Sequence, residues 1–114
     1  MKNVLIVDDD PLGRSSLEAV LTVLGFEVQT ASSGLEALEI AKNSKLDFSV
    51  IDWMLGDNMN GVEVADALNL LHPNIRIVLI SGHAEIESQQ LNGKPYSYLT
   101  KPFHVQQLLG FFEL

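Results

Sequence analysis

The residues best suited to chemistry in this sequence are polar side chains that directly follow short apolar runs. They are Asp8, Asp9 and Asp10 after the first run, Asp52 after a second, Ser81 after a third and Lys101 after a fourth. Carboxylates gathered in one cleft repel one another, and a divalent cation relieves that repulsion. A partial shell of carboxylate oxygens completed by water favours Mg²⁺, with Mn²⁺ as an alternative.

A metal ion beside a carboxylate is typical of phosphoryl transfer. In that chemistry one carboxylate attacks phosphorus as the nucleophile, and the cation binds the incoming phosphoryl group. A lysine neutralises a second phosphoryl oxygen, and a hydroxyl donates a hydrogen bond to a third. The sequence therefore offers a residue for each role, provided that the fold brings the four runs together.

Short apolar runs alternate with helical patterns along the whole chain. Asp10 before Pro11 is typical of a helix N-cap followed by proline at the first helical position, and Gly25 ends that helix. Capping-box patterns at 33–36 and 60–63 open two further helices. The patterns predict strands at 3–7, 26–30, 48–51, 75–80 and 96–100, and helices at 11–24, 34–43, 61–71, 84–91 and from 104 onward.

Apolar residues at helical spacing predict which face of each helix is buried. The expected core positions are Leu17, Val20, Leu21 and Leu24, then Leu35, Leu38 and Ala41, then Val64, Leu68 and Leu71, and finally Val105, Leu108, Leu109 and Phe112. If the last helix is clipped or continues into another domain, Phe111 or Phe112 is left exposed and marks a partner or homodimer surface.

Strands separated by helices of about ten residues cannot pair as hairpins. Right-handed crossovers make such strands parallel and place helices on both faces of the sheet. We therefore predict an α/β fold, a doubly wound five-stranded parallel sheet that forms a single domain over residues 1–114. Ligands bind such sheets at the carboxyl ends of the strands, which is where the polar residues named above lie.

Composition narrows the class of protein. The chain has 114 residues, 46% of them hydrophobic, which suffices for the core of one domain. Its longest apolar runs have four residues, against the roughly 20 that span a bilayer. Because it also lacks cysteine, we expect a cytoplasmic protein without membrane contact. With 15 acidic and 7 scattered basic residues, the formal charge of −8 argues against direct nucleic-acid binding.

Four motifs together resemble the receiver domain of two-component response regulators. They are VDDDP at 7–11, VID at 50–52, LISGH at 79–83 and YLTKPF at 98–103, and in this order they cover essentially the whole chain. The resemblance extends to the receivers of hybrid sensor histidine kinases, because Leu55-Gly56-Asp57 replaces the proline-containing loop often found after the phosphorylated aspartate. It implies the flavodoxin-like receiver fold and a role in phosphorelay signalling.

The resemblance implies which residues accept the phosphoryl group and hold the metal. Asp52 matches the phosphoacceptor of the family. Asp8 and Asp9 match its acidic pair, of which Asp9 binds the metal directly and Asp8 binds it mainly through water. The backbone carbonyl of Met54 completes the ligands that the protein supplies.

The resemblance also implies the residues of the switch. Lys101 matches the family's lysine and Ser81 its hydroxyl, both of which contact the phosphoryl group, and Ser81 and Tyr98 change position after phosphorylation. The bond between Lys101 and Pro102 is expected to be cis. His83, like Met54, lies where family members control the water that hydrolyses the acyl phosphate.

By the same resemblance, the phosphoryl donor is a phosphohistidine on a histidine kinase or phosphotransfer domain, or a small donor such as acetyl phosphate. The chain is then a signalling phosphoacceptor that catalyses its own phosphotransfer and dephosphorylation, rather than an enzyme that acts on other substrates. Its output passes to an attached or a separate output domain.

Three other functions are compatible with parts of the pattern. A pseudo-receiver is a protein-binding module that works without phosphorylation, and the intact Asp9, Asp52 and Lys101 argue against it. A phosphatase of the haloacid dehalogenase type needs a second acid two residues after the nucleophile, where this chain has Met54. A dinucleotide-binding domain needs a glycine-rich fingerprint after the first strand, where the sequence is DDDPLG.

Overall fold

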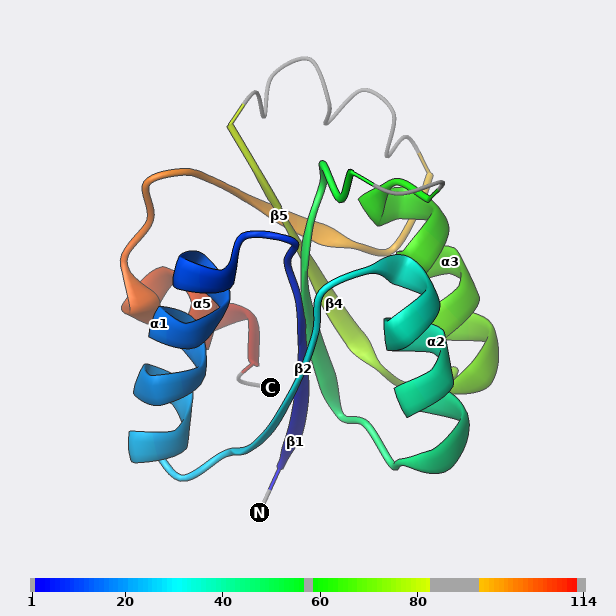
Figure 1. The fold of residues 1–114 in the computed structure, drawn as a ribbon, viewed down its shortest axis with the longest axis horizontal. Helices are drawn as coiled ribbons and strands as arrows, with labels where there is room; N and C mark the ends of the chain where they lie inside the picture. The colour runs from blue at the N-terminus through cyan, green and yellow to red at the C-terminus, as the bar shows by residue number, and fades with distance from the viewer. Residues whose placement is uncertain (1, 57–58, 83–92, 113–114) are drawn as a thin grey trace.

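Strands and helices alternate along the chain (Figure 1). The computed structural model describes residues 2–56, 59–82 and 93–112. In chain order the elements are β1 (Asn3–Val7), α1 (Pro11–Val23), β2 (Glu27–Ala31), α2 (Gly34–Asn43), β3 (Phe48–Asp52), α3 (Gly61–Leu71), β4 (Arg76–Ser81), β5 (Ser97–Thr100) and α5 (Val105–Phe112). The helix predicted at 84–91 and the residue His83 lie outside the described residues.

The five strands form one parallel sheet in the order β2-β1-β3-β4-β5. Helices α1 and α5 cover one face of the sheet, and α2 and α3 cover the other (Figure 1). The chain therefore winds outward in both directions from β1 and β3. This confirms the predicted doubly wound sheet.

Two apolar layers, one on each face of the sheet, make up the core. The layer under α2 and α3 contains side chains from alternate positions of the central strands, including Leu5, Val7, Ile51, Ile77 and Leu79. The layer under α1 and α5 contains the intervening positions, including Val4, Ile6, Val50, Val78 and Ile80. Burial on both faces explains why these strands read as continuous apolar runs. None of the helices in the described ranges has the length and apolar character that crossing a bilayer requires.

The buried face of α2 differs from the prediction. Leu35 is 68% exposed, whereas Ala41 is buried and Leu38 packs partly buried against the core, as predicted, and Ala37 is buried in addition. The cause is close packing between α2 and α3, because a Cβ on Gly34 would lie 2.8 Å from the side chain of Val64. A helix held this closely presents its small residues to its neighbour, and the leucine turns to solvent.

Helices α1 and α3 also bury narrower stripes than predicted. Leu21 is buried and Leu17 is partly buried, but Val20 and Leu24 are exposed. Helix α1 contacts both β1 and β2, so only the ridge along Leu17 and Leu21 faces the sheet. Leu71, the last residue of α3, is also exposed. Apolar periodicity alone therefore overestimates the width of the core stripe on α1, α2 and α3, whereas all four predicted positions of α5 pack against the core.

The C-terminal helix is anchored by an aromatic cluster. The ring of Phe112 stacks on Phe48 with centroids 4.3 Å apart and meets Phe26 edge-on at 5.6 Å. Phe112 is 7% exposed, and Phe111 packs partly buried against the same layer. The burial predicted for Phe112 from its helical spacing is therefore confirmed, and the exposure expected for a clipped helix does not occur, because the ring packs between Phe48 of β3 and Phe26 just before β2.

The helix starts follow the capping chemistry read from the sequence. At α3 the box is complete, since Asn60 accepts from the Glu63 amide and Glu63 accepts from the Asn60 amide, each at 2.9 Å. At α2 the hydroxyl of Ser33 accepts from the Glu36 amide, but Glu36 reaches one residue further back, to the amide of Ser32. Strands β2, β4 and β5 each begin one residue later than predicted. These shifts leave the strand ends that carry the polar residues in place.

Candidate functional site

The carboxyl ends of four neighbouring strands meet at one edge of the sheet. Val7 at the end of β1 pairs with Ile51, so Asp8 and Asp52 follow adjacent positions. Asp52 pairs in turn with Ile80, the residue before Ser81. Because the strands are parallel, every polar residue that ends a strand or follows one lies at the same edge.

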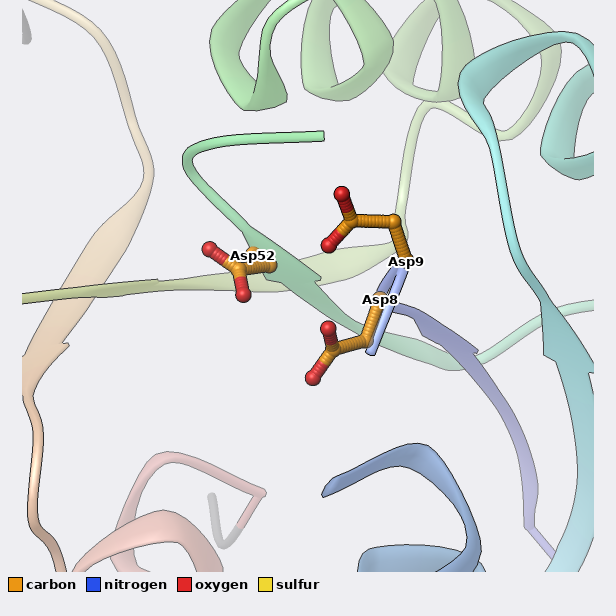
Figure 2. A group of neighbouring side chains, drawn as sticks. All are labelled: Asp8, Asp9 and Asp52. Carbon is orange, nitrogen blue, oxygen red and sulfur yellow. The ribbon is translucent and has the colours of Figure 1, made fainter. Parts of the chain in front are cut away.

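Three carboxylates converge at this edge. Asp8, Asp9 and Asp52 each place an oxygen within 4.8 Å of the other two. Figure 2 shows the carboxylate of Asp9 pointing from the loop after β1 toward Asp52, with Asp8 beside them. Asp52 is 8% exposed, Asp8 is half-buried and Asp9 is exposed. Carboxylate oxygens at this spacing are the donors that Mg²⁺ or Mn²⁺ prefers, so the residues fit a divalent cation.

The turn that carries the first two acids is held by hydrogen bonds. The Asp10 amide donates to the Asp8 carboxylate at 2.9 Å, and the Asp8 amide donates to the Ala31 carbonyl at 3.1 Å. Asp10 itself caps α1, accepting from the Leu12 and Gly13 amides, which confirms its predicted structural role. The turn is therefore fixed to β2 on one side and to α1 on the other.

The acid cluster is electrostatically unfavourable without a cation. Burial raises the pKa of the Asp8 carboxyl above its ordinary value, and the negative charge of Asp52 raises it further. The hydrogen bond from the Asp10 amide and the charge of Lys101 act in the opposite direction but do not cancel the rise. A carboxyl destabilised in its charged form by burial and by a neighbouring carboxylate is stabilised when a cation binds between them.

Asp52 is held at both carboxylate oxygens. Its Oδ2 accepts from the Lys101 ammonium at 2.8 Å, and its Oδ1 accepts from the Met54 amide at 3.1 Å. Burial lowers the pKa of Lys101, but the hydrogen bond and charge of Asp52 outweigh this, so the pKa is raised overall. Lys101 therefore stays charged beside Asp52 at neutral pH.

The segment after β5 places this lysine. The Lys101 amide donates to the Ser81 carbonyl at 2.8 Å, which ties the end of β5 to the end of β4. The peptide bond between Lys101 and Pro102 is cis, as expected. Ser81 is 2% exposed at the end of β4 and pairs with Thr100. The structure thus brings Ser81 and Lys101 to the edge that carries Asp52.

Two other predicted residues lie further out. Tyr98 is 43% exposed on β5, so its side chain is turned to the surface in this structure. The side chain of Met54 is 70% exposed, and its amide rather than its side chain contacts Asp52.

Two glycines next to the acids were not singled out from the sequence. A Cβ on Gly61 would lie 2.7 Å from the Asp52 carbonyl oxygen, so the start of α3 passes directly against the end of β3. Gly56 has a φ of +71°, and a Cβ there would lie 2.8 Å from a carboxylate oxygen of Asp9. A glycine after a capping asparagine and a glycine in a short loop were the available signals. Neither reveals a close approach to another segment.

A cavity of about 550 Å³ opens beside the carboxylates, between α1 and the segment after β5. Asp8, Asp52 and Lys101 line its polar side, and Leu17 and Phe103 lie among its apolar lining residues. The Asp52 carboxylate is therefore reachable from outside the fold despite its low exposure.

Sequence relatives support a single family. Residues 4–113 match the response regulator receiver domain family. The cell cycle transcriptional regulator CtrA of Caulobacter vibrioides is 32% identical over 109 residues, which cover 94% of this chain and 47% of CtrA. The nitrogen assimilation regulatory protein NtrX of Azorhizobium caulinodans is 32% identical over 111 residues, covering 94% of this chain and 24% of NtrX. The chain thus spans less than half the length of these curated relatives.

Solved structures agree with the sequence comparison. A response regulator receiver protein from Sinorhizobium medicae superposes with a TM-score of 0.88 at 33% identity, covering 96% of this chain and 90% of that one. A Burkholderia pseudomallei response regulator, solved with a phosphorylated aspartic acid, a calcium ion and citrate, gives a TM-score of 0.88 at 30% identity, covering 99% and 67%. With the acid cluster at the strand ends, these matches show that the chain belongs to the response regulator receiver domain family.

Proposed function

We propose that this chain accepts a phosphoryl group on Asp52 from the phosphohistidine of a histidine kinase or phosphotransfer domain, in a Mg²⁺-dependent reaction. The observation that carries the proposal is the position of Asp52, which contacts the Lys101 ammonium at 2.8 Å and has a carboxylate oxygen within 4.8 Å of oxygens of Asp8 and Asp9. The related Burkholderia pseudomallei response regulator was solved with a phosphorylated aspartic acid and a calcium ion, which supports the proposal.

The proposed transfer follows from the chemistry of these residues. A carboxylate oxygen of Asp52 attacks phosphorus, the P–N bond of the phosphohistidine breaks, and the imidazole leaves with the electron pair of that bond. The Lys101 ammonium then donates to a phosphoryl oxygen instead of the Asp52 carboxylate. Asp8, Asp9 and Asp52 would hold Mg²⁺, together with the backbone carbonyl of Met54. Bound Mg²⁺ supplies positive charge that stabilises the oxygens of the phosphoryl group.

The proposed switch uses the strands next to Asp52. The acyl phosphate adds about two negative charges, which draw the Ser81 hydroxyl toward a phosphoryl oxygen. Its buried position at the end of β4, beside Thr100 of β5, supports this role. We further propose that Tyr98, exposed in this structure, then turns inward and changes the surface of β4 and β5.

We propose that the chain acts as one receiver domain in the cytoplasm and passes its state to an attached or separate output domain. The match covers 47% of CtrA and 24% of NtrX, so more than half of each relative lies outside it, which supports an attached output domain. The receiver would not itself contact nucleic acid or membrane, in line with its charge of −8. The homodimer stays a prediction, but its proposed contact through an exposed Phe112 is withdrawn. Autodephosphorylation by water completes the proposed cycle.

The test is labelling with acetyl phosphate. With Mg²⁺ present, the intact mass of the protein should rise by one phosphoryl group, and the label should be lost in Asp52→Asn. Asp66→Asn, a matched change of a half-exposed acid on α3, should label normally. Label that persists in Asp52→Asn refutes the assignment. Absence of any label favours the pseudo-receiver, and continuous turnover of unrelated phosphoesters favours a phosphatase.

A further inference from the structure

Arg14, close to the start of α1, makes an unusual contact with the acidic turn. Its guanidinium donates to the backbone carbonyl of Asp8 at 2.8 Å, although three carboxylates stand nearby. Among the residues that the structure describes, the guanidinium forms no ion pair with any carboxylate. The guanidinium geometry matches a carboxylate, and arginine–carboxylate pairs are frequently bidentate. Its binding to a carbonyl therefore needs an explanation.

The contact closes a clamp around the turn. The amide of Arg14 donates to the Asp10 carbonyl at 3.0 Å, while its side chain reaches back to the Asp8 carbonyl. Both ends of the turn are thus tied to one residue of α1. The Asp8 carboxylate is held from the other side by the Asp10 amide. Together these bonds fix the direction in which the side chains of Asp8 and Asp9 leave the backbone.

Because the Arg14 guanidinium binds the Asp8 carbonyl, the carboxylates of Asp8 and Asp9 remain available to a cation. A guanidinium paired with Asp8 or Asp9 would occupy the oxygens that a cation needs. Bound to the carbonyl, it orders the same turn without using a carboxylate oxygen. Arg14 as a whole is half-buried, so its guanidinium has less freedom than that of a fully exposed arginine.

We propose that Arg14 is a positioning residue of the cation site, a role that rests on the function proposed above. By clamping the Asp8 carbonyl, it holds Asp8 and Asp9 facing Asp52 before the cation arrives. Residues that orient metal ligands in this way change metal affinity by about 10-fold to 100-fold when they are removed.

Charge and positioning predict opposite results for the same variant. Arg14 carries a positive charge near a site for a cation, so removing that charge alone would tighten Mg²⁺ binding. Loss of the clamp would weaken it, because the turn would have to be ordered when the ion binds. The sign of the change in affinity therefore separates the two effects.

The experiment measures Mg²⁺ binding by titration calorimetry on unphosphorylated protein. Arg14→Met and Arg14→Gln each introduce a neutral side chain that cannot donate to the Asp8 carbonyl as arginine does. Both variants should bind Mg²⁺ about tenfold more weakly than the wild-type protein. Arg14→Lys keeps a donor and the charge, and it should recover most of the affinity. Lys42→Met removes an exposed positive charge at the far end of α2 and should leave binding unchanged.

Urea unfolding without Mg²⁺ shows which of Arg14→Met and Arg14→Gln is folded. One folded variant of the two is sufficient for the binding test. Wild-type affinity or tighter binding in that variant overturns the positioning role while leaving the proposed function intact. Failure of the wild-type protein to bind Mg²⁺ would instead refute the cation site itself, and Arg14 with it.

Discussion

Replacing Gly61 with alanine introduces a methyl group where the structure has no room for one. The new Cβ would lie 2.7 Å from the Asp52 carbonyl oxygen, 2.9 Å from the Cα of Trp53 and 3.2 Å from a methyl group of Leu79. The first two atoms are main chain, and the Trp53 amide is bonded to the Ile80 carbonyl at 2.9 Å. The strain cannot be relieved by rotating a side chain, so β3 or α3 must move.

The expected loss of stability follows from two opposing contributions. Overpacking a buried site costs about 1–3 kcal/mol, and the rigid backbone neighbours favour the upper part of that range. Alanine in place of glycine recovers up to about 1 kcal/mol of helix propensity. We therefore expect Gly61→Ala to lower the free energy of unfolding by about 2 kcal/mol. With a urea m-value of roughly 2 kcal/mol/M, the midpoint falls by about 1 M.

Gly110→Ala is the matched control. Gly110 lies within α5, and a Cβ there would meet nothing within 4 Å. Alanine should raise the free energy of unfolding by about 0.5–1 kcal/mol. Trp53, the only tryptophan, is 4% exposed and reports unfolding by fluorescence in both variants. Gly61→Ala should also slow labelling by acetyl phosphate, because the clash displaces Asp52. Equal midpoints for the two variants would refute the packing argument.

Three further changes test other parts of the structure. Asp66→Ala removes the hydrogen bonds that Tyr96 and Lys94 donate to the Asp66 carboxylate. Burial raises the pKa of Asp66, but these hydrogen bonds outweigh it and lower the pKa overall. The charged carboxylate therefore stabilises the fold above about pH 4. Its loss should cost about 0.5–1 kcal/mol at pH 7 and less as the pH falls to 3, measured by urea unfolding; a cost independent of pH contradicts this. Asn60→Ala removes the cap of α3 and should cost about 1 kcal/mol in the same assay, where a neutral result would be inconsistent with the capping box. Gly56→Ala places a Cβ at a residue with positive φ, where it also clashes with Asp9. The Mg²⁺ affinity measured by calorimetry should therefore fall. An unchanged affinity would show that the loop adapts.

The arrangement of the acids is predictable from sequence because it depends on short-range rules. An apolar run followed by Asp52, with helical spacers on both sides, is enough to place that carboxylate at the ligand-binding edge of a parallel sheet. The same rules place Ser81 and Lys101 at that edge. The caps at Asp10 and Asn60 are equally local, since each depends on amides within three residues.

Features that depend on packing between distant segments are not predictable in this way. Leu35 has the spacing of a core residue, yet the close approach of Gly34 to Val64 turns it to solvent. Gly61 and Arg14 matter because of atoms that lie next to them only after folding. One sequence records residue types but not which backbone another segment will touch.

The sheet order has a consequence for amide hydrogen exchange. Within the described part of the chain, strands β1 and β3 are paired on both sides, whereas β5 lies at the edge of the sheet and pairs with β4 alone. Amides of the inner strands should exchange only when the whole protein unfolds, and those of β5 through smaller local openings. The site thus joins acids that end or directly follow the most protected strands to a lysine that directly follows one of the least protected strands. Local opening of β5 would release Lys101 from Asp52 while the three carboxylates keep their places.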